Sequence, residues 1–179
     1  MTDYPMLTLN DGRQLPQIGF GTYQIDNDKA AEAVRTAVDV GYKMVDTAAV
    51  YQNEDGVGDG LTETPNIFLQ TKIWNASQGY DRTLKAAEKC LDRLGRDNVD
   101  MLLIHWPCPE KGLFVETWKA LIELRDQGKA KSIGVSNFRT EDLKRIADET
   151  GVTPALNQIE LHPSFQQREL RKQHSDMGI

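Results

Sequence analysis

The chain has little cysteine, no long apolar run and no basic tract, and each shortage narrows its class. Cys90 and Cys108 are the only cysteines; the first falls in a helical pattern and the second in a proline-flanked loop. A disulfide framework is therefore not expected, and a reducing cytoplasm is the predicted compartment. No stretch approaches the ~20 apolar residues of a membrane span, and the N-terminal region lacks the basic-then-apolar pattern of a signal peptide. We expect a cytoplasmic protein without a membrane partner.

Positive charge is also in short supply. The chain has 21 Lys and Arg against 27 Asp and Glu, a net charge of −6, and both signs are spread along its length. It therefore has no basic patch for a phosphate backbone, which argues against a nucleic-acid partner. With 179 residues, 39% of them hydrophobic, it is long enough for one core and too short for two comfortable domains. We expect a single domain over residues 1–179.

What the chain does contain is a repeated alternation of strand and helix patterns. A hairpin over residues 7–15, turning at Asn10-Asp11-Gly12, comes first. The predicted strands that follow cover residues 17–23, 42–46, 67–72, 99–105, 132–136 and 155–161. The predicted helices between and after them cover residues 28–40, 53–61, 80–94, 115–127, 140–151 and 166–177. Within the second helix, Gly60 stands where alanine would favour the helix, so we expect it to cost stability.

This alternation is typical of parallel α/β folds, either an open doubly wound sheet or a closed barrel. No phosphate-binding G-x-G-x-x-G follows the first strand, and polar residues follow nearly every strand. Both observations favour a (β/α)8 TIM barrel, of which this chain covers the hairpin and six βα units. A complete barrel takes ~250 residues, so we expect 179 residues to be its N-terminal two-thirds.

Ionisable residues stand where successive strands end. Asp46, Lys72 and His105 each close an apolar strand, and Tyr51 follows Asp46 by five residues. An unpaired charge at such a place is costly, and the carboxyl ends of barrel strands meet at one mouth. Their convergence predicts a site that can act on a carbonyl group.

Each of these residues has an ordinary structural interpretation when taken singly. A tyrosine in such a loop is usually at the rim, an Asp after a strand often forms a turn, and a lysine is usually solvated. A second hypothesis is a metal-dependent hydrolase that uses Asp46, His105 and His162. Such sites need three or more converging ligands, and with only three histidines in the chain we expect no metal.

Five runs of the sequence resemble the aldo-keto reductase family, above all its short bacterial branch with the 2,5-diketogluconate reductases. They are Gly-Tyr-Lys-Met-Val-Asp-Thr-Ala-Ala-Val-Tyr-Gln-Asn-Glu (41–54), Thr-Lys-Ile-Trp (71–74), Leu-Ile-His-Trp-Pro (103–107), Gly-Val-Ser-Asn-Phe (134–138) and Asn-Gln-Ile-Glu-Leu-His-Pro (157–163). The match is collinear over the whole chain, and the runs are specific as a set.

The resemblance implies a catalytic tetrad of Asp46, Tyr51, Lys72 and His105. Tyr51 would protonate the carbonyl oxygen as hydride arrives from NADPH. An unperturbed tyrosine has a pKa near 10, and we expect the Lys72 cation at hydrogen-bond distance to lower it. Asp46 would pair with Lys72 and limit the cost of burying the ammonium. His105 would orient the substrate carbonyl and share its developing charge.

The resemblance also implies cofactor and substrate contacts. The residues that would bind the cofactor are Thr22, Asp46, Ser136, Asn137 and Gln158, of which the last three would hold the nicotinamide carboxamide. The residues that would bind the substrate are Tyr23, Trp74, His105 and Trp106. The family's main phosphate-binding residues follow the seventh and eighth strands, beyond the expected part of the barrel.

The sequence thus predicts an NADPH-dependent reductase of small aldehydes and ketones, with sugar-derived dicarbonyls among them, and a monomer when full-length. The alternative is a truncated or regulatory barrel that keeps the tetrad without turnover.

Overall fold

The computed structural model describes residues 4–64 and 66–179. An antiparallel hairpin of β1 (Met6–Thr8) and β2 (Gln14–Pro16) precedes a parallel sheet whose strands pair in chain order. The sheet strands are β3 (Phe20–Gly21), β4 (Met44–Asp46), β5 (Phe68–Ile73), β6 (Val99–Ile104), β7 (Ala130–Ser136) and β8 (Asn157–Gln158). Pairing in chain order is what successive right-handed βα units produce.

Helices alternate with these strands. They are α1 (Asn27–Asp39), α2 (Glu54–Gly60), α3 (Tyr80–Leu94), α4 (Phe114–Asp126), α5 (Thr140–Thr150) and α6 (Arg168–Met177). Short 3₁₀ turns follow three of the strands: η1 (Ala49–Tyr51), η2 (Asn75–Ser77) and η3 (Pro109–Lys111). The helices lie within two residues of their predicted ranges, because periodic apolar positions and glycine stops define them well.

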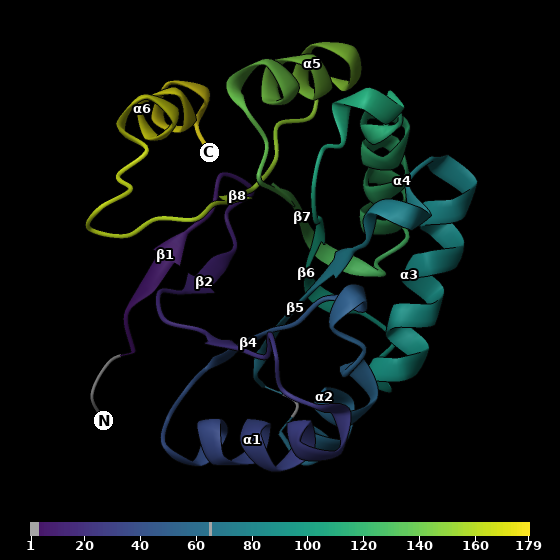
Figure 1. Cartoon of the computed structure of the whole chain (residues 1–179), viewed down its shortest axis with the longest axis vertical. Coiled ribbons are helices and arrows are strands. Elements are labelled where there is room, and N and C mark those ends of the chain that lie inside the picture. The colour runs from purple at the N-terminus through teal and green to yellow at the C-terminus, as the bar shows by residue number, and fades with distance from the viewer. Residues whose placement is uncertain (1–3, 65) are drawn as a thin grey trace.

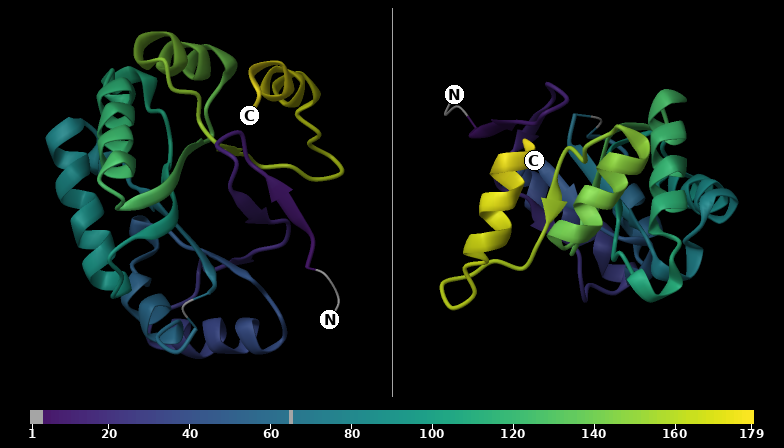
Figure 2. Two further views of the ribbon diagram at one scale, coloured as in Figure 1. Left: turned by 180° about the vertical axis from the view of Figure 1, so that it is seen from behind. Right: turned by 90° about the horizontal axis from the view of Figure 1, so that it is seen from above.

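The sheet curls around a centre and carries its helices on the outer side only (Figure 1). An open doubly wound sheet would carry helices on both faces, so the predicted fold class is confirmed as a six-stranded part of the barrel. Seen from behind, the helices again follow one another around the outer side of the curled sheet (Figure 2, left). The carboxyl ends of β4 to β8, and the loops that follow them, therefore meet at one mouth of the barrel.

The first and last sheet strands are shorter than predicted. Residues 17–23 and 155–161 were expected to be strands, but the ladder is restricted to Phe20–Gly21 and Asn157–Gln158. Each of the two pairs with a neighbour on one side only. A strand without a second neighbour has fewer ladder hydrogen bonds to extend it.

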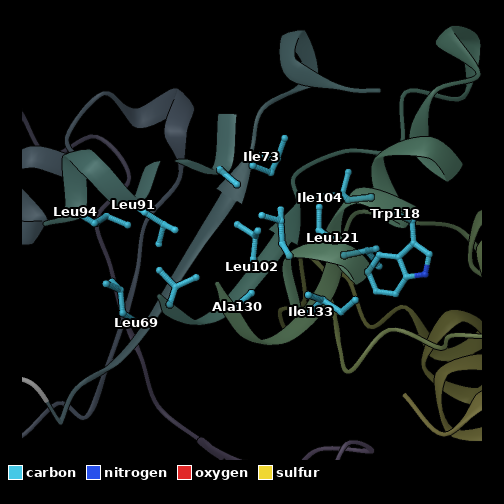
Figure 3. Close-up of a cluster of buried hydrophobic side chains, with 14 of the residues drawn as sticks. Leu69, Ile73, Leu91, Leu94, Leu102, Ile104, Trp118, Leu121, Ala130 and Ile133 are labelled. Atoms are coloured by element: carbon cyan, nitrogen blue, oxygen red, sulfur yellow. The ribbon is translucent and has the colours of Figure 1, made fainter. Parts of the chain in front are cut away.

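The larger of two hydrophobic clusters lies between the sheet and its helices, and Figure 3 shows the part of it next to α3 and α4. Leu91 and Leu94 of α3 and Trp118 and Leu121 of α4 point toward side chains of β5 to β7. The α3 helix ends at Gly95, whose φ of 60° is the left-handed conformation that glycine adopts without strain. The amphipathic period of the sequence thus decides which face each helix turns to the sheet.

The prediction that Gly60 lowers the stability of the protein relative to alanine is wrong. A Cβ atom at Gly60 would lie 2.8 Å from the Val34 Cβ and 2.9 Å from the Ala31 carbonyl oxygen of α1. At Gly58 it would lie 2.5 Å from the Leu94 carbonyl oxygen. These glycines let α2 approach α1 and α3 closely, which outweighs their low helix propensity.

Candidate active site

Lys72 and Asp46 form a buried ion pair at the barrel mouth. The Lys72 side chain is 2% exposed, and its Nζ donates to Asp46 Oδ1 at 2.5 Å and to the Thr47 carbonyl oxygen at 2.9 Å. Burial lowers the pKa of Lys72, and the nearby Asp46 carboxylate opposes that shift. A buried ammonium needs such partners, so the expected pairing of Lys72 with Asp46 is present.

Tyr51 lies at the end of η1, beside that pair. The Lys72 Nζ is 5.4 Å from the centre of the Tyr51 ring, a distance at which a cation is attracted to the ring face. The ring of His105 meets the Tyr51 ring edge-on, with centroids 5.8 Å apart. The four residues of the expected tetrad therefore face one another across one small volume.

Lys72 was expected to lower the pKa of Tyr51, but in this structure the pKa of Tyr51 is raised. Burial, reinforced by the negative charge of Asp46 and by Tyr23, raises the pKa of Tyr51 to about 12. Within residues 4–64 and 66–179, the Lys72 ammonium makes no hydrogen bond to the Tyr51 hydroxyl. Its donors go to Asp46 and Thr47 instead, so the desolvation of the phenol outweighs the effect of the cation.

His105 is a neutral ring at physiological pH. Burial and the Lys72 charge lower its pKa to about 4. Trp74 packs edge-on against it, with centroids 5.2 Å apart, and the His105 Nδ1 is buried without a partner among the described residues. A neutral imidazole can donate one hydrogen bond and accept another.

Two residues of the Tyr51 loop that sequence reasoning did not single out hold that loop in place. Asn53 is fully buried; its Nδ2 donates to the Thr22 and Ile25 carbonyl oxygens at 2.9 Å, and its Oδ1 accepts from Thr47 Oγ1 at 2.9 Å. It thereby ties the loop to the ends of β3 and β4. The quoted run Tyr-Gln-Asn-Glu contained it, but nothing in its spacing indicated burial.

Glu54 makes a second attachment. Its buried carboxylate accepts from Thr71 Oγ1 at 2.5 Å and is paired with Arg93 of α3. Thr71 adjoins Lys72 along β5, so this network links the Tyr51 loop to the strand that carries the ammonium. A buried carboxylate is costly to desolvate, and the cation and the hydroxyl offset part of that cost.

The residues expected to hold a carboxamide converge at the ends of β7 and β8. The Gln158 carbonyl oxygen accepts from Ser136 Oγ at 3.0 Å and from the Asn137 backbone N–H at 2.9 Å. The Asn137 Nδ2 donates to the His105 carbonyl oxygen at 3.0 Å, which leaves its amide oxygen without a partner among the described residues. A free acceptor beside a hydroxyl and a second amide fits a carboxamide group.

Thr22 takes a different position. It is fully buried, and its hydroxyl faces the Asp46 carbonyl oxygen at 3.3 Å. It therefore supports the strand that carries Asp46 rather than presenting a hydroxyl at the surface.

The residues expected to bind the substrate do not all line one cavity: His105 packs against Trp74 but is not among the lining residues of the cavity that Trp74 borders. Trp74 and Trp106 line a cavity of about 670 Å³ next to Asn137 and the 107–110 loop. Tyr23 lies outside that cavity, 67% exposed, and packs on Tyr51 with ring centroids 5.2 Å apart. The tryptophans therefore form an apolar wall, while Tyr23 covers the outer side of Tyr51.

The residues of the alternative metal site are not brought together. His162 lies on the exposed segment after β8, where its ring contacts Glu160. Among residues 4–64 and 66–179, no three His, Cys, Asp or Glu side chains are grouped so that they could hold a metal ion. Across the same residues, none of the helices has the length and apolarity to cross a bilayer.

Comparison with known proteins places these residues in a family context. The sequence pattern of the aldo/keto reductase family matches residues 17–179. An aldo-keto reductase of Mycobacterium sp. (strain KMS) is 50% identical over 98% of this chain and 65% of its own length. Methylglyoxal reductase DkgA of Escherichia coli (strain K12) is 44% identical over 95% of this chain and 62% of its own length. The 2,5-diketo-D-gluconic acid reductase B of Corynebacterium sp. is 42% identical over 100% of this chain and 66% of its own length.

A solved structure gives the same result. A variant of Gox0644 in complex with NADPH superposes with a TM-score of 0.97 at 53% identity, over 98% of this chain and 65% of that one. The chain thus spans 65% of the length of the first of these relatives.

Proposed function

The chain belongs to the aldo/keto reductase family, and on that premise we propose that it reduces small aldehydes and ketones to alcohols with NADPH. The observation that carries the proposal is the buried Lys72–Asp46 pair beside Tyr51 and His105. A charge pair is costly to bury, and a phenol and an imidazole beside it are groups that exchange protons with an oxygen atom.

The cofactor assignment rests on the fit of residues at the ends of β7 and β8. Ser136, Asn137 and Gln158 would hold the carboxamide of a nicotinamide, with Asn137 supplying a free acceptor. When bound, a reduced nicotinamide supplies the hydride, which is the difficult part of the chemistry. The NADPH complex of the similar Gox0644 variant supports NADPH as the dinucleotide. Asp46 is also proposed to contact the cofactor, and Thr22, whose buried hydroxyl faces the Asp46 carbonyl oxygen, would contribute near the nicotinamide ribose by supporting the Asp46 strand.

Tyr51 is the proposed proton donor. With its pKa raised to about 12, the phenol is fully protonated at neutral pH. As negative charge develops on the substrate oxygen, the Lys72 ammonium, 5.4 Å from the centre of the Tyr51 ring, would act through space on the phenolate that remains after proton transfer. Asp46 holds the ammonium in place, and the neutral His105 donates a hydrogen bond to the same oxygen.

The proposed substrates are small carbonyl compounds, dicarbonyls among them. The Trp74–Trp106 cavity is open and combines these apolar rings with polar residues such as Asn137, which suits small carbonyl substrates held with little selectivity. Two relatives are a methylglyoxal reductase and a 2,5-diketo-D-gluconic acid reductase, both named for dicarbonyl substrates. We propose further that the protein is cytoplasmic, is monomeric when full-length and forms one domain over residues 1–179.

Fluorescence titration with NADPH, followed by NADPH consumption in the presence of methylglyoxal, tests the proposal. Saturable binding and carbonyl-dependent consumption are expected. Binding without consumption would favour the alternative of a barrel that keeps the site without turnover. Failure to bind NADPH would contradict the proposed function itself.

A further inference from the structure

Gln70 is a buried polar residue inside the barrel that the tetrad does not account for. It lies two residues before Lys72 on β5, so both side chains point to the same, inner side of the strand. Gln70 is 1% exposed. Its Nε2 donates to Asp46 Oδ1 at 2.7 Å and to Gln158 Oε1 at 3.0 Å.

Gln158 also forms a hydrogen bond directly with Asp46. The Gln158 Nε2 donates to Asp46 Oδ2 at 3.1 Å. Asp46, Gln70 and Gln158 therefore form a triangle in which each side chain bonds to both others. The triangle joins β4, β5 and β8, and it reaches the Lys72 ammonium through Asp46.

The orientation of the Gln70 amide is forced. Its Oε1 is buried without a partner among the described residues. Rotating the amide by half a turn would aim this oxygen at the Asp46 carboxylate and at Gln158 Oε1, which are both acceptors. The donor must therefore face the triangle, and the oxygen is left unsatisfied.

An unsatisfied buried acceptor argues against a purely structural role. Met101 and Leu103 of the adjoining β6 are fully buried apolar residues, so this part of the barrel interior accepts apolar side chains. An apolar residue at position 70 would avoid the unpaired oxygen. What it would lose are the hydrogen bonds to Asp46 Oδ1 and to Gln158 Oε1, which fix these two side chains relative to each other.

We propose that Gln70 is a positioning residue for the nicotinamide site, which it serves by fixing the side-chain amide of Gln158. The inference rests on the proposed function, since it concerns how Gln158 meets the carboxamide. The Gln158 Oε1 accepts a hydrogen bond from Gln70, and one of the two Gln158 Nε2 hydrogens is donated to Asp46. The second Nε2 hydrogen of Gln158 is then held in one direction as the donor for a carboxamide oxygen. The same triangle joins the carboxamide site to the Asp46–Lys72 pair.

The first test follows the Gln158 amide itself and needs no cofactor. In ¹H–¹⁵N spectra, the two side-chain amide protons of Gln158 are expected to be widely separated and slow to exchange in the wild type. In the Gln70→Met variant, which keeps the side-chain volume and removes the donor, we expect the two signals to move closer together and the protons to exchange faster. Thr71→Val is the matched control: Thr71 is the next residue of β5, is equally buried and bonds Glu54 on the other side of the sheet.

The second test measures ligand binding by fluorescence titration. Gln70→Met is expected to weaken NADPH binding about three- to tenfold, the effect of one lost or misdirected hydrogen bond. Binding of 2′-phosphoadenosine diphosphoribose, which lacks the nicotinamide, is expected to be unchanged. The melting temperature is expected to stay within about 4 °C of the wild type. Gln70→Leu, which also removes the donor and is apolar like the adjoining Met101 and Leu103, serves if the methionine variant does not fold.

The outcomes are distinguishable. Unchanged Gln158 amide signals, or equal loss of affinity for both ligands, would overturn the positioning role of Gln70. Equal NADPH affinity in wild type and Gln70→Met would overturn it as well. A wild-type chain that binds no NADPH would instead overturn the proposed function, and with it the role of Gln70 toward a cofactor.

Discussion

A lysine side chain as buried as that of Lys72 needs compensation, and its partners limit what it can do for its neighbours. Its hydrogen bonds go to Asp46 and to the Thr47 carbonyl oxygen, so it acts on Tyr51 through space across 5.4 Å. Sequence reasoning singled out both Lys72 and Asp46 because strands rarely end on a charge by chance, and the family resemblance implied that they pair. It could not predict the raised pKa of Tyr51, because that depends on how deeply the phenol is buried.

The residues around the tetrad were the hardest to predict. Asn53, Glu54 and Gln70 are polar residues in ordinary positions: the first two stand at the start of α2, and Gln70 lies within β5. Their burial arises from which strands become neighbours, which one-dimensional patterns do not give. Ser136, Asn137 and Gln158 were named from the resemblance, and their convergence depends on the parallel register of β7 and β8.

His105 provides a pH prediction at this scale. Its pKa in the folded chain is about 4, below its ordinary value of 6.5, because burial and Lys72 disfavour the charged ring. The unfolded chain therefore binds a proton at a higher pH than the folded chain does. As the pH falls from 6.5 toward 4, stability is expected to decrease.

Two measurements check this. NMR titration of the His105 ring should give a midpoint near 4, and a midpoint near the ordinary value would contradict the buried environment. In denaturant titrations, a His105→Asn variant should lose part of the decline in stability over the same pH range, because asparagine does not titrate.

The boundaries of helices with a strong apolar period were predicted closely, whereas the boundaries of strands, which depend on hydrogen bonds to a neighbouring strand, were not. The α3 range was predicted as 80–94 and is Tyr80–Leu94, since its stripe and its Gly95 stop are local signals. The short β3 and β8 depend on a neighbour on one side only. The role of Gly60 was misjudged because helix propensity is local, whereas the approach of α1 to α2 is a tertiary contact.

Substituting Gly60 tests this close approach. Gly60→Ala is expected to destabilise the protein by about 1–2 kcal/mol, because overpacking against Val34 and Ala31 exceeds the gain in helix propensity. Denaturant unfolding measures the change. Asp59→Ala, at the exposed neighbouring position of α2, is the matched control and should be neutral or slightly stabilising. A Gly60→Ala variant more stable than wild type would show that propensity dominates.

At the scale of the whole molecule, the order of elements in the sequence predicted the architecture. Alternating strand and helix patterns with short connections leave few parallel topologies, and right-handed crossovers select the one observed. One core cluster includes residues from α1 to α5, with Leu170 of α6 packed against it. That continuity supports the proposal of a single domain.

A single domain is expected to unfold in one cooperative transition. Far-UV circular dichroism reports the helices, and tryptophan fluorescence reports the three tryptophans, of which Trp118 is fully buried and donates to the Val152 carbonyl oxygen after α5. The two denaturant midpoints should coincide. Separate midpoints would contradict the single-domain proposal.

The central proposal is that Tyr51 gives the proton to a carbonyl oxygen beside the Lys72–Asp46 pair. Its most direct test is the rate of NADPH consumption with methylglyoxal for wild type and Tyr51→Phe, with NADPH binding measured in parallel. The variant keeps the ring that packs on Tyr23 and His105 and loses only the hydroxyl. We expect it to fold and bind NADPH like the wild type while turnover falls by about 10²-fold or more. Turnover equal to that of the wild type would show that Tyr51 is not the acid.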